Sequence, residues 1–162
     1  SDYCNPIHIG ILYCFSGLAP IPFAKGHIGF IGFKPILSQI LRGVAKGLEQ
    51  KKSFSFSDFA DALRVGSEQA YKVVAQPVEG TILTVIREVS EEASWVAKKK
   101  ASFGRAIASV VVRAKDTVRR TPEMLPVLKE AGVVDAGSPR LYYFFQGMES
   151  AISKKKASAC SG

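Results

Sequence analysis

The sequence predicts an all-α protein, an antiparallel bundle of about six helices with an irregular segment in front. From Pro35 onward, apolar residues recur at three- and four-residue steps, as they do along one face of a helix. Prolines, glycines and capping residues divide this region into segments of helix length with short connections, which is typical of a bundle. No sustained alternation of apolar and polar residues marks a strand, and the β-branched run 103–118 is long for one, at sixteen residues.

The first two helices are predicted from one apolar stripe each. Pro35 suits the first turn of the first helix. Its stripe consists of Ile36, Leu37, Ile40, Leu41, Val44 and Leu48. After a polar break over 51–57, Ser57 is predicted to be the N-cap of the second helix, with Asp58 and Asp61 near the positive end of the helix dipole. The second stripe consists of Phe59, Ala62, Leu63, Gly66, Ala70, Val73 and Val74.

The third and fourth helices follow after a proline-containing connection. The third is predicted from Gly80 or Thr81 to about Ala97, and Ser102 is predicted to cap the fourth. The apolar positions of the third are Ile82, Leu83, Ile86, Val89, Ala93 and Val96. Those of the fourth are Phe103, Ile107, Val110, Val111, Ala114 and Val118.

The fifth and sixth helices are predicted from their start signals. Thr121, Pro122 and Glu123 read as the cap, first-turn proline and acidic second position of the fifth, which Gly132 closes. Pro126 then lies inside this helix, removes an amide donor and predicts a kink or a short irregular start. Ser138-Pro139 opens the sixth helix. Its apolar face consists of Leu141, Phe144, Phe145, Met148 and Ile152.

The chain therefore divides into three parts. Residues 1–34 form an irregular, apolar lead-in, because its glycines recur every third residue near its end and resist helix formation. Residues 35–153 form the helical domain, and residues 154–162 form a basic polar tail. No Lys, Arg, Asp or Glu occurs from Tyr3 to Ala24, but the stretch free of proline is shorter than a membrane-spanning helix, so no membrane span is expected.

Composition excludes several classes of protein. With 162 residues, 47% of them hydrophobic, the chain is long enough for one globular domain with a core. The three cysteines, Cys4, Cys14 and Cys160, are too few and too scattered for a disulfide framework, so a reducing, cytoplasmic setting is expected. The net charge of +8 could attract nucleic acid, anionic lipid or nucleotide phosphates, and without a motif it predicts no specific nucleic-acid binding.

Three longer segments carry a resemblance to a known family. They include Ile-Leu-Ser-Gln-Ile-Leu-Arg at 36–42, Pro-Val-Glu-Gly-Thr-Ile-Leu-Thr-Val at 77–85, and Leu-Pro-Val-Leu-Lys-Glu-Ala-Gly-Val-Val-Asp-Ala-Gly at 125–137. In this order they resemble the nucleotide-binding domain of the dihydroxyacetone-kinase-like family, and most closely the ATP-binding subunit of bacterial fatty acid kinase. The likeness covers about residues 35–153.

This resemblance implies both a fold and an activity. The family fold is a barrel of eight antiparallel helices, of which the six predicted here correspond to the last six. ATP binds at one end through magnesium, and its γ-phosphate is transferred, in fatty acid kinase to an acyl chain presented by a separate fatty-acid-binding protein. The resemblance therefore implies ATP and magnesium as cofactors and such a protein as a partner.

The metal site of the family is not found in this sequence. The family holds magnesium with an Asp-Gly-Asp-Thr-Gly-Thr loop between its first two helices. The chain has five aspartates, and none forms an Asp-x-Asp motif: Asp2, Asp58, Asp61, Asp116 and Asp135. No metal ligand and no catalytic residue is carried over, so we expect weak or absent magnesium-ATP binding and no turnover.

Two of the family's nucleotide-contacting motifs match in part. Ala-Lys-Gly-His-Ile-Gly at 24–29 resembles a phosphate-contacting motif, which makes Gly26 and Gly29 candidates for backbone contacts to an anion. Gly80 and Thr81 begin a helix, and the exposed amides of a helix start suit an anion. The alternative for Gly80 and Thr81 is an ordinary helix cap.

A third motif lies before the last helix. Asp135, Ala136 and Gly137 match the Asp-Ala-Gly loop that contributes to the family's nucleotide pocket. Ser138-Pro139-Arg140 then replaces the usual Gly-Gln-Gly. The alternative is a plain turn between helices, since Asp-x-Gly is common turn chemistry.

Other residues with possible chemistry are assigned to structure. His8 and His27 have no partner at catalytic spacing. Trp95, Tyr142 and Tyr143 lie at helical positions and are predicted to pack in the core or on the surface rather than to stack on bases.

A second class of function remains open from the sequence. If two helices of a closed barrel are absent, an apolar seam is exposed, and such a patch favours association with a partner protein or a second copy of the chain. The chain would then be a non-catalytic helical interaction module. The likeness ends abruptly before Ile36, so we expect residues 1–34 to come from a frameshift, a fragmentary gene model or a wrong splice.

Overall fold

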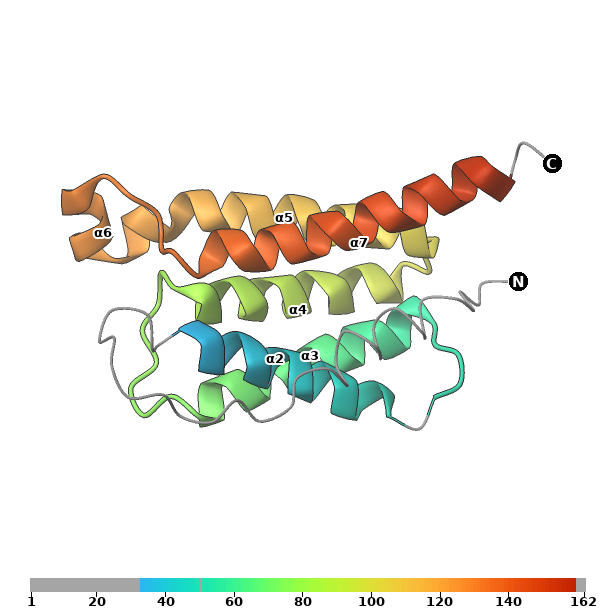
Figure 1. Ribbon diagram of the computed structural model, residues 1–162, viewed down its shortest axis with the longest axis horizontal. Helices are drawn as coiled ribbons and strands as arrows, with labels where there is room; N and C mark the ends of the chain where they lie inside the picture. Colours follow the sequence, from blue (N-terminus) through green and yellow to red (C-terminus); the bar gives the residue numbers. More distant parts are fainter. Residues whose placement is uncertain (1–32, 50, 160–162) are drawn as a thin grey trace.

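A computed structural model of the protein describes residues 33–49 and 51–159, and this part of the chain is all-helical, as predicted (Figure 1). No strand occurs within these residues. The helices are α2 (Phe33–Leu48), α3 (Phe56–Lys72), α4 (Ile82–Lys98), α5 (Phe103–Met124), α6 (Pro126–Ala131) and α7 (Ser138–Ala159). Gly26 and Gly29, both histidines and all three cysteines lie outside the described residues.

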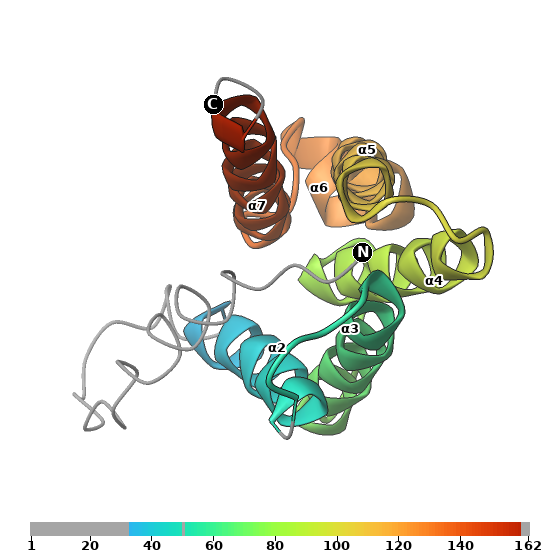
Figure 2. The same ribbon diagram turned by 90° about the vertical axis from the view of Figure 1, so that its right-hand side faces the viewer.

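The long helices run antiparallel and pack on their neighbours in the chain. Helix α2 packs on α3, α3 on α4, α4 on α5 and α5 on α7. Figure 1 shows α4 between the α2–α3 pair and the α5–α7 pair, and Figure 2 shows that the helices follow one another in a curved row. Short connections force this order, because each helix must turn back beside the one before it. One end of the bundle therefore collects the starts of α4 and α7 and the end of α5.

The predicted apolar stripes form the core. The largest fully buried side chains come from five helices: Ile40, Phe59, Leu63, Val85, Ile86, Val89, Ile107, Val110, Leu141 and Phe145. Burying each of these side chains contributes about 1.5–3 kcal/mol of hydrophobic free energy. Val73 is an exception to the prediction, because it is the C-cap of α3 and is 46% exposed.

Two glycines let α2 and α3 approach closely. A Cβ atom on Gly43 would lie 2.6 Å from the Cα of Gly66 and 2.9 Å from the carbonyl oxygen of Val65. One turn further on, a Cβ on Gly47 would lie 2.7 Å from the Cα of Ala62. The two backbones are therefore in direct contact, which only residues without a side chain, or with a methyl group, allow at these positions.

The start of α3 differs from the prediction. The N-cap is Ser55 and not Ser57: the Ser55 hydroxyl accepts from the amide of Asp58 at 3.3 Å, and the Asp58 carboxylate accepts from the amide of Ser55 at 2.8 Å. This reciprocal capping box begins the helix two residues earlier than predicted. The predicted polar break is also wrong, because Phe54 and Phe56 are buried in it.

These phenylalanines join three segments of the chain. The rings of Phe54, Phe56 and Phe59 each lie 5.5–6.1 Å, between centroids, from the ring of Phe103 at the start of α5. Aromatic pairs at this separation contribute beyond the area that they bury. The connection before α3 is thus held against α5 at the end of the bundle opposite the start of α4.

The predicted fifth helix starts later than expected. Helix α5 continues through Pro122 to Met124, and α6 begins only at Pro126. Pro122 has no N–H to donate to the carbonyl of Val118, but the Thr121 hydroxyl donates to that carbonyl at 2.8 Å instead. The hydrogen bond from the Thr121 hydroxyl takes the place of the missing backbone bond, which explains why the proline is tolerated inside α5. Pro126, expected inside a helix, occupies the first turn of α6, where a missing N–H is harmless.

Most of the other predicted helix ends are confirmed. Thr81 is the N-cap of α4, and Gly132 ends α6 with a φ of 66° in the left-handed conformation that glycine adopts readily. Ser102 is the N-cap residue of α5, although its side chain makes no capping hydrogen bond. Helix α7 starts at Ser138 and continues to Ala159, through the Lys154–Lys156 run. Among the described residues no helix is long and apolar enough to cross a bilayer.

Candidate functional site

Two of the segments predicted to contact nucleotide meet at one end of the bundle, on either side of Thr121. The amide of Asp135 donates to the Thr121 hydroxyl at 3.3 Å. On the other side, a Cβ atom on Gly80 would lie 3.0 Å from the Thr121 carbonyl oxygen. The fold thus brings Gly80 and Asp135 together, although fifty-four residues separate them in the sequence.

Gly80 is held tightly in the turn before α4. Its φ is 83°, a left-handed conformation that side chains disfavour, and the residue is buried. Its amide donates to the hydroxyl of Thr84 at 2.9 Å, inside the turn. Leu125 and Met124 at the end of α5 lie against it, at 3.0 and 3.1 Å from where a Cβ would be. Gly80 therefore fixes the start of α4 against the end of α5, and its amide is used within the protein.

Thr81 adopts the capping role that the sequence left as the alternative. Its hydroxyl accepts from the amide of Leu83 at 3.3 Å and donates to the carbonyl of Val78 at 2.8 Å. The cap orients the first turn of α4 toward the end of the bundle. Contact between Thr81 and a nucleotide stays a prediction.

Asp135 organises the start of α7. One carboxylate oxygen accepts from the amide of Ser138 at 3.0 Å and from the hydroxyl of Ser138 at 2.7 Å. Gly137 and Ser138 are buried, whereas Ala136 is exposed. The Asp135–Gly137 turn is therefore a defined structure, and its contacts to a nucleotide also stay a prediction.

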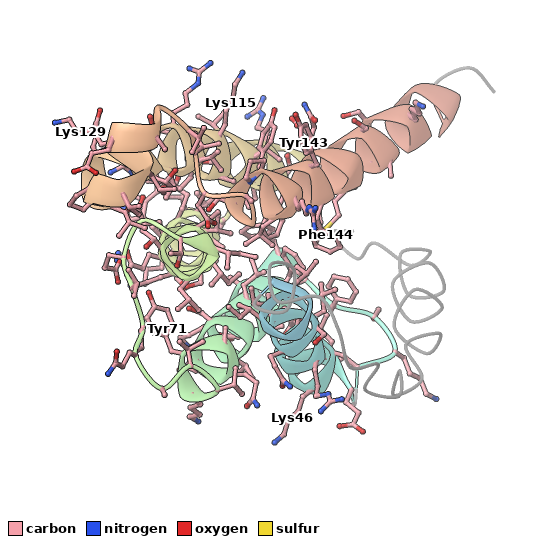
Figure 3. All side chains as sticks on the ribbon, turned by 60° about the vertical axis from the view of Figure 1, so that its left-hand side comes forward. Lys46, Tyr71, Lys115, Lys129, Tyr143 and Phe144 are labelled. Carbon is pink, nitrogen blue, oxygen red and sulfur yellow. The ribbon has the colours of Figure 1, made fainter. Side chains whose placement is uncertain are left out.

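A polar network that the sequence analysis did not anticipate surrounds Glu79. Its carboxylate accepts from the Thr84 hydroxyl at 2.7 Å, from Arg87 at 3.0 Å and from the Tyr71 hydroxyl at 3.2 Å. Tyr71 lies beside the loop that leads into α4 (Figure 3). The network ties the end of α3 to the first two turns of α4 and so holds the loop that carries Gly80.

The network shifts the titration of its members. Burial acts to raise the pKa of the Glu79 carboxyl, but the hydrogen bonds from Thr84 and Arg87 outweigh it, so this pKa lies below its ordinary value of 4.5. Desolvation acts to lower the pKa of Arg87, yet the hydrogen bond to Glu79 keeps this pKa above its ordinary value. Burial raises the pKa of the Tyr71 hydroxyl. The ionised form of Glu79 is thus the one that the fold stabilises.

We expect Glu79 to make stability depend on pH in the acidic range. Because its pKa is lower in the folded state, the stabilisation is fully present above the ordinary value of 4.5 and is lost as the pH falls through the folded value. The unfolding free energies of the native protein and of Glu79→Gln, measured by urea denaturation between pH 7 and pH 3, should therefore converge in acid. A difference that stays constant over this range would show that the ionised carboxylate contributes nothing.

Comparison with known proteins decides the family. A model described as the DAK2 domain matches residues 29–150. The chain belongs to the DAK2 domain family. This confirms the resemblance to dihydroxyacetone-kinase-like nucleotide-binding domains that the sequence motifs carry.

Bacterial proteins related to this DAK2 domain are much longer than the chain. Protein YloV of Bacillus subtilis is 41% identical over 129 residues, which are 80% of this chain and 22% of that protein. An uncharacterized protein of Staphylococcus saprophyticus is 37% identical over 138 residues, which are 85% of this chain and 24% of that protein. The chain thus spans about a quarter of the length of these relatives.

The residues of this DAK2 domain that the structure describes do not fit a magnesium site. The two carboxylates nearest the Gly80 turn, those of Glu79 and Asp135, are already bound to Arg87 and to Ser138. Within the described ranges, no three His, Cys, Asp or Glu side chains gather as the ligands of a cation would. No step through a metal ion is therefore derived from this structure.

Arg120 is the cation closest in sequence to Thr121, and it is occupied. It donates to Glu88 of α4 at 2.6 Å and to Asp116 at 3.1 Å. Glu88 also accepts from the buried hydroxyl of Thr117 at 2.8 Å. In the DAK2 domain this cluster ties α4 to α5 just below the Gly80 turn. The signal that could have revealed it is the spacing of Asp116, Thr117 and Arg120 on one face of α5.

Proposed function

We propose that the chain is the nucleotide-binding, kinase-like domain of a cytoplasmic phosphotransferase of the fatty acid kinase or dihydroxyacetone kinase type. The observation that carries this proposal is the meeting of the Gly80–Thr81 turn and the Asp135–Gly137 turn at Thr121. Both turns lie in segments that resemble the nucleotide-contacting segments of that family. The nucleotide would lie at this end, against Thr81 and the Asp135–Gly137 turn, and Gly80, whose amide is bound to Thr84, would position the turn that carries Thr81.

The chain is proposed to bind magnesium-ATP weakly and not to turn it over. Phosphoryl transfer depends on cations that neutralise the charge of the triphosphate. The sequence has no Asp-x-Asp motif, and the carboxylates of Glu79 and Asp135 are used by neighbouring side chains. Without ligands for the cation, only direct contacts of the two turns with the nucleotide would remain.

Isothermal titration of the whole chain with ATP tests this proposal. We expect no affinity in the micromolar range, no ATP consumption, and the same weak heat with magnesium as with EDTA. Micromolar affinity for magnesium-ATP together with detectable hydrolysis would contradict the proposed absence of a magnesium-binding site. Titration with magnesium chloride alone is the control for heat that does not involve nucleotide.

The location of the weak binding can be tested separately. In amide NMR spectra recorded with excess ATP, the shifted signals should be those of residues 79–84 and 135–139. Shifts confined to other helices would reject this end of the bundle as the nucleotide site even if ATP binds.

The proposed partner follows from the family resemblance. In a fatty acid kinase, the phosphoryl acceptor is an acyl chain presented by a separate fatty-acid-binding protein. We propose the same class of partner for the longer protein to which a domain of this kind belongs.

A further inference from the structure

The two ends of the bundle differ in charge. Residues 49, 51–61, 98–105 and 149–154, which lie at the end away from the Gly80 turn, contain seven Lys or Arg and four Asp or Glu. Residues 72–81 and 116–140, at the end with the Gly80 turn, contain five of each. One end thus carries a basic surplus that the other end lacks, and we call it the lysine end.

Contacts between side chains bring these segments together. Phe54 and Phe56 pack on Phe103, which places the 49–61 segment beside the start of α5. A Cβ atom on Gly104 would lie 3.8 Å from the side chain of Ile152, which places the second half of α7 there too. In Figure 1 the end of α4, the start of α5 and the end of α7 lie at the same side of the molecule.

The cations of the lysine end are available to a partner. Lys52, Lys98, Lys100, Arg105 and Lys154 form no ion pair within the part of the chain that the structure describes. By contrast, the nearest acidic side chains of α4 are occupied: Glu91 pairs with Arg87 and Glu92 with Arg113. The local potential is therefore positive and is not cancelled by neighbouring carboxylates of α4.

An exposed aromatic ring lies beside one lysine of this end, Lys99. Trp95, in the last turn of α4, is 53% exposed, and the ammonium group of Lys99 lies 3.3 Å from the centre of its ring. A tryptophan is amphipathic, with an apolar body and one N–H donor, and is enriched where water meets a membrane. Trp95 is the only tryptophan of the chain.

We propose that the lysine end docks on an anionic lipid surface, with Trp95 entering the headgroup layer. Clustered lysines are attracted by the negative surface potential of acidic lipids. Each lysine that comes near the surface adds to the binding affinity. Six of the seven cations are Lys and one is Arg, which favours a diffuse anionic surface over base-specific recognition of nucleic acid, because the commonest base contact uses the planar fork of Arg. Docking here would leave the Gly80 end facing the solution.

Fluorescence of Trp95 tests this proposal directly. The chain is titrated with vesicles of phosphatidylcholine alone, or of phosphatidylcholine with 30% phosphatidylglycerol. We expect a blue shift of Trp95 with the anionic vesicles alone, and its loss in 0.5 M salt, since salt screens the attraction. Equal response to neutral vesicles, or binding without a change in Trp95 emission, would overturn the proposal.

Matched variants distinguish binding through the lysine end from a general effect of the net charge of the chain. In cosedimentation with anionic vesicles, Lys98→Gln, Lys99→Gln and Lys100→Gln combined should weaken binding by about a hundredfold, from about a fivefold loss per lysine. Combining Lys72→Gln, Lys115→Gln and Lys129→Gln removes the same charge elsewhere; Figure 3 shows Lys115 and Lys129 projecting from other parts of the molecule. Equal weakening by both sets would overturn the proposal, as would complete displacement from the vesicles by an equal charge of duplex DNA.

Discussion

Gly43→Ala is expected to destabilise the protein by about 3 kcal/mol, although alanine is the better helix former. The added methyl group would lie 2.6 Å from the Cα of Gly66 and 2.9 Å from the carbonyl oxygen of Val65. Both are backbone atoms, so no side-chain rotation relieves the overlap and the two helices must separate. Separation would loosen the contacts of Ile40 and Val44 with the core as well.

The control for Gly43 is another glycine inside a helix, at a position where an added methyl group would contact no other residue. Gly147 is exposed in α7, and a Cβ atom there meets nothing within 4 Å. Gly147→Ala should therefore stabilise the protein, by about 0.5–1 kcal/mol from helix propensity. Urea denaturation of both variants measures the two changes. If Gly43→Ala were as harmless as Gly147→Ala, the close packing of α2 on α3 would be wrong.

Gly80→Ala is expected to destabilise the protein by about 2–3 kcal/mol, from about 1–2 kcal/mol of left-handed backbone strain and a further cost of crowding. The φ of Gly80 is 83°, and a Cβ would lie 3.0 Å from both the Thr121 carbonyl oxygen and the Leu125 side chain. The strain would be relieved by moving the start of α4 away from the end of α5. The proposed nucleotide end would then lose its geometry together with its stability.

Substitution of Gly132 separates the cost of backbone strain from the cost of crowding. It also has a positive φ, 66°, but a Cβ there has open space within 4 Å. Gly132→Ala should therefore cost about 1 kcal/mol, the backbone strain alone. Thermal or urea unfolding of both variants gives the difference, which measures the crowding between α4 and α5. Equal costs for the two substitutions would mean that the Gly80 turn does not press against the end of α5.

The sequence predicts the helices better than their ends. Apolar spacing identifies the buried faces because a helix repeats every 3.6 residues, and Ile86, Ile107 and Phe145 are buried as expected. The sequence predicts the start of α3 at Ser57, because the phenylalanines before it lie in an otherwise polar connection. Their burial depends on Phe103, which is some fifty residues away in the chain, and local patterns do not contain such a contact.

The same limit applies to Pro122 and to the candidate site. A threonine followed by a proline is a common start of a helix, and only the bond from Thr121 to the Val118 carbonyl shows that α5 continues instead. The motifs locate Gly80 and Asp135 separately, but their meeting at Thr121 depends on the antiparallel order of α4, α5 and α7. The network of Glu79 was missed because its acceptor lies in the loop before α4, whereas its donors come from α3 and α4.

Helix α6 buries none of its side chains: Val127 within it is 61% exposed, and Val133 just after it is 51% exposed. Opening of the segment between α5 and α7 therefore exposes little new apolar surface, and it requires far less free energy than global unfolding. Helix α6 can open at this low cost while the five long helices keep their packing and the Asp135–Gly137 turn keeps its bonds to Thr121 and Ser138. Local opening beside the candidate site and rigidity of the bundle are thus compatible in one small domain.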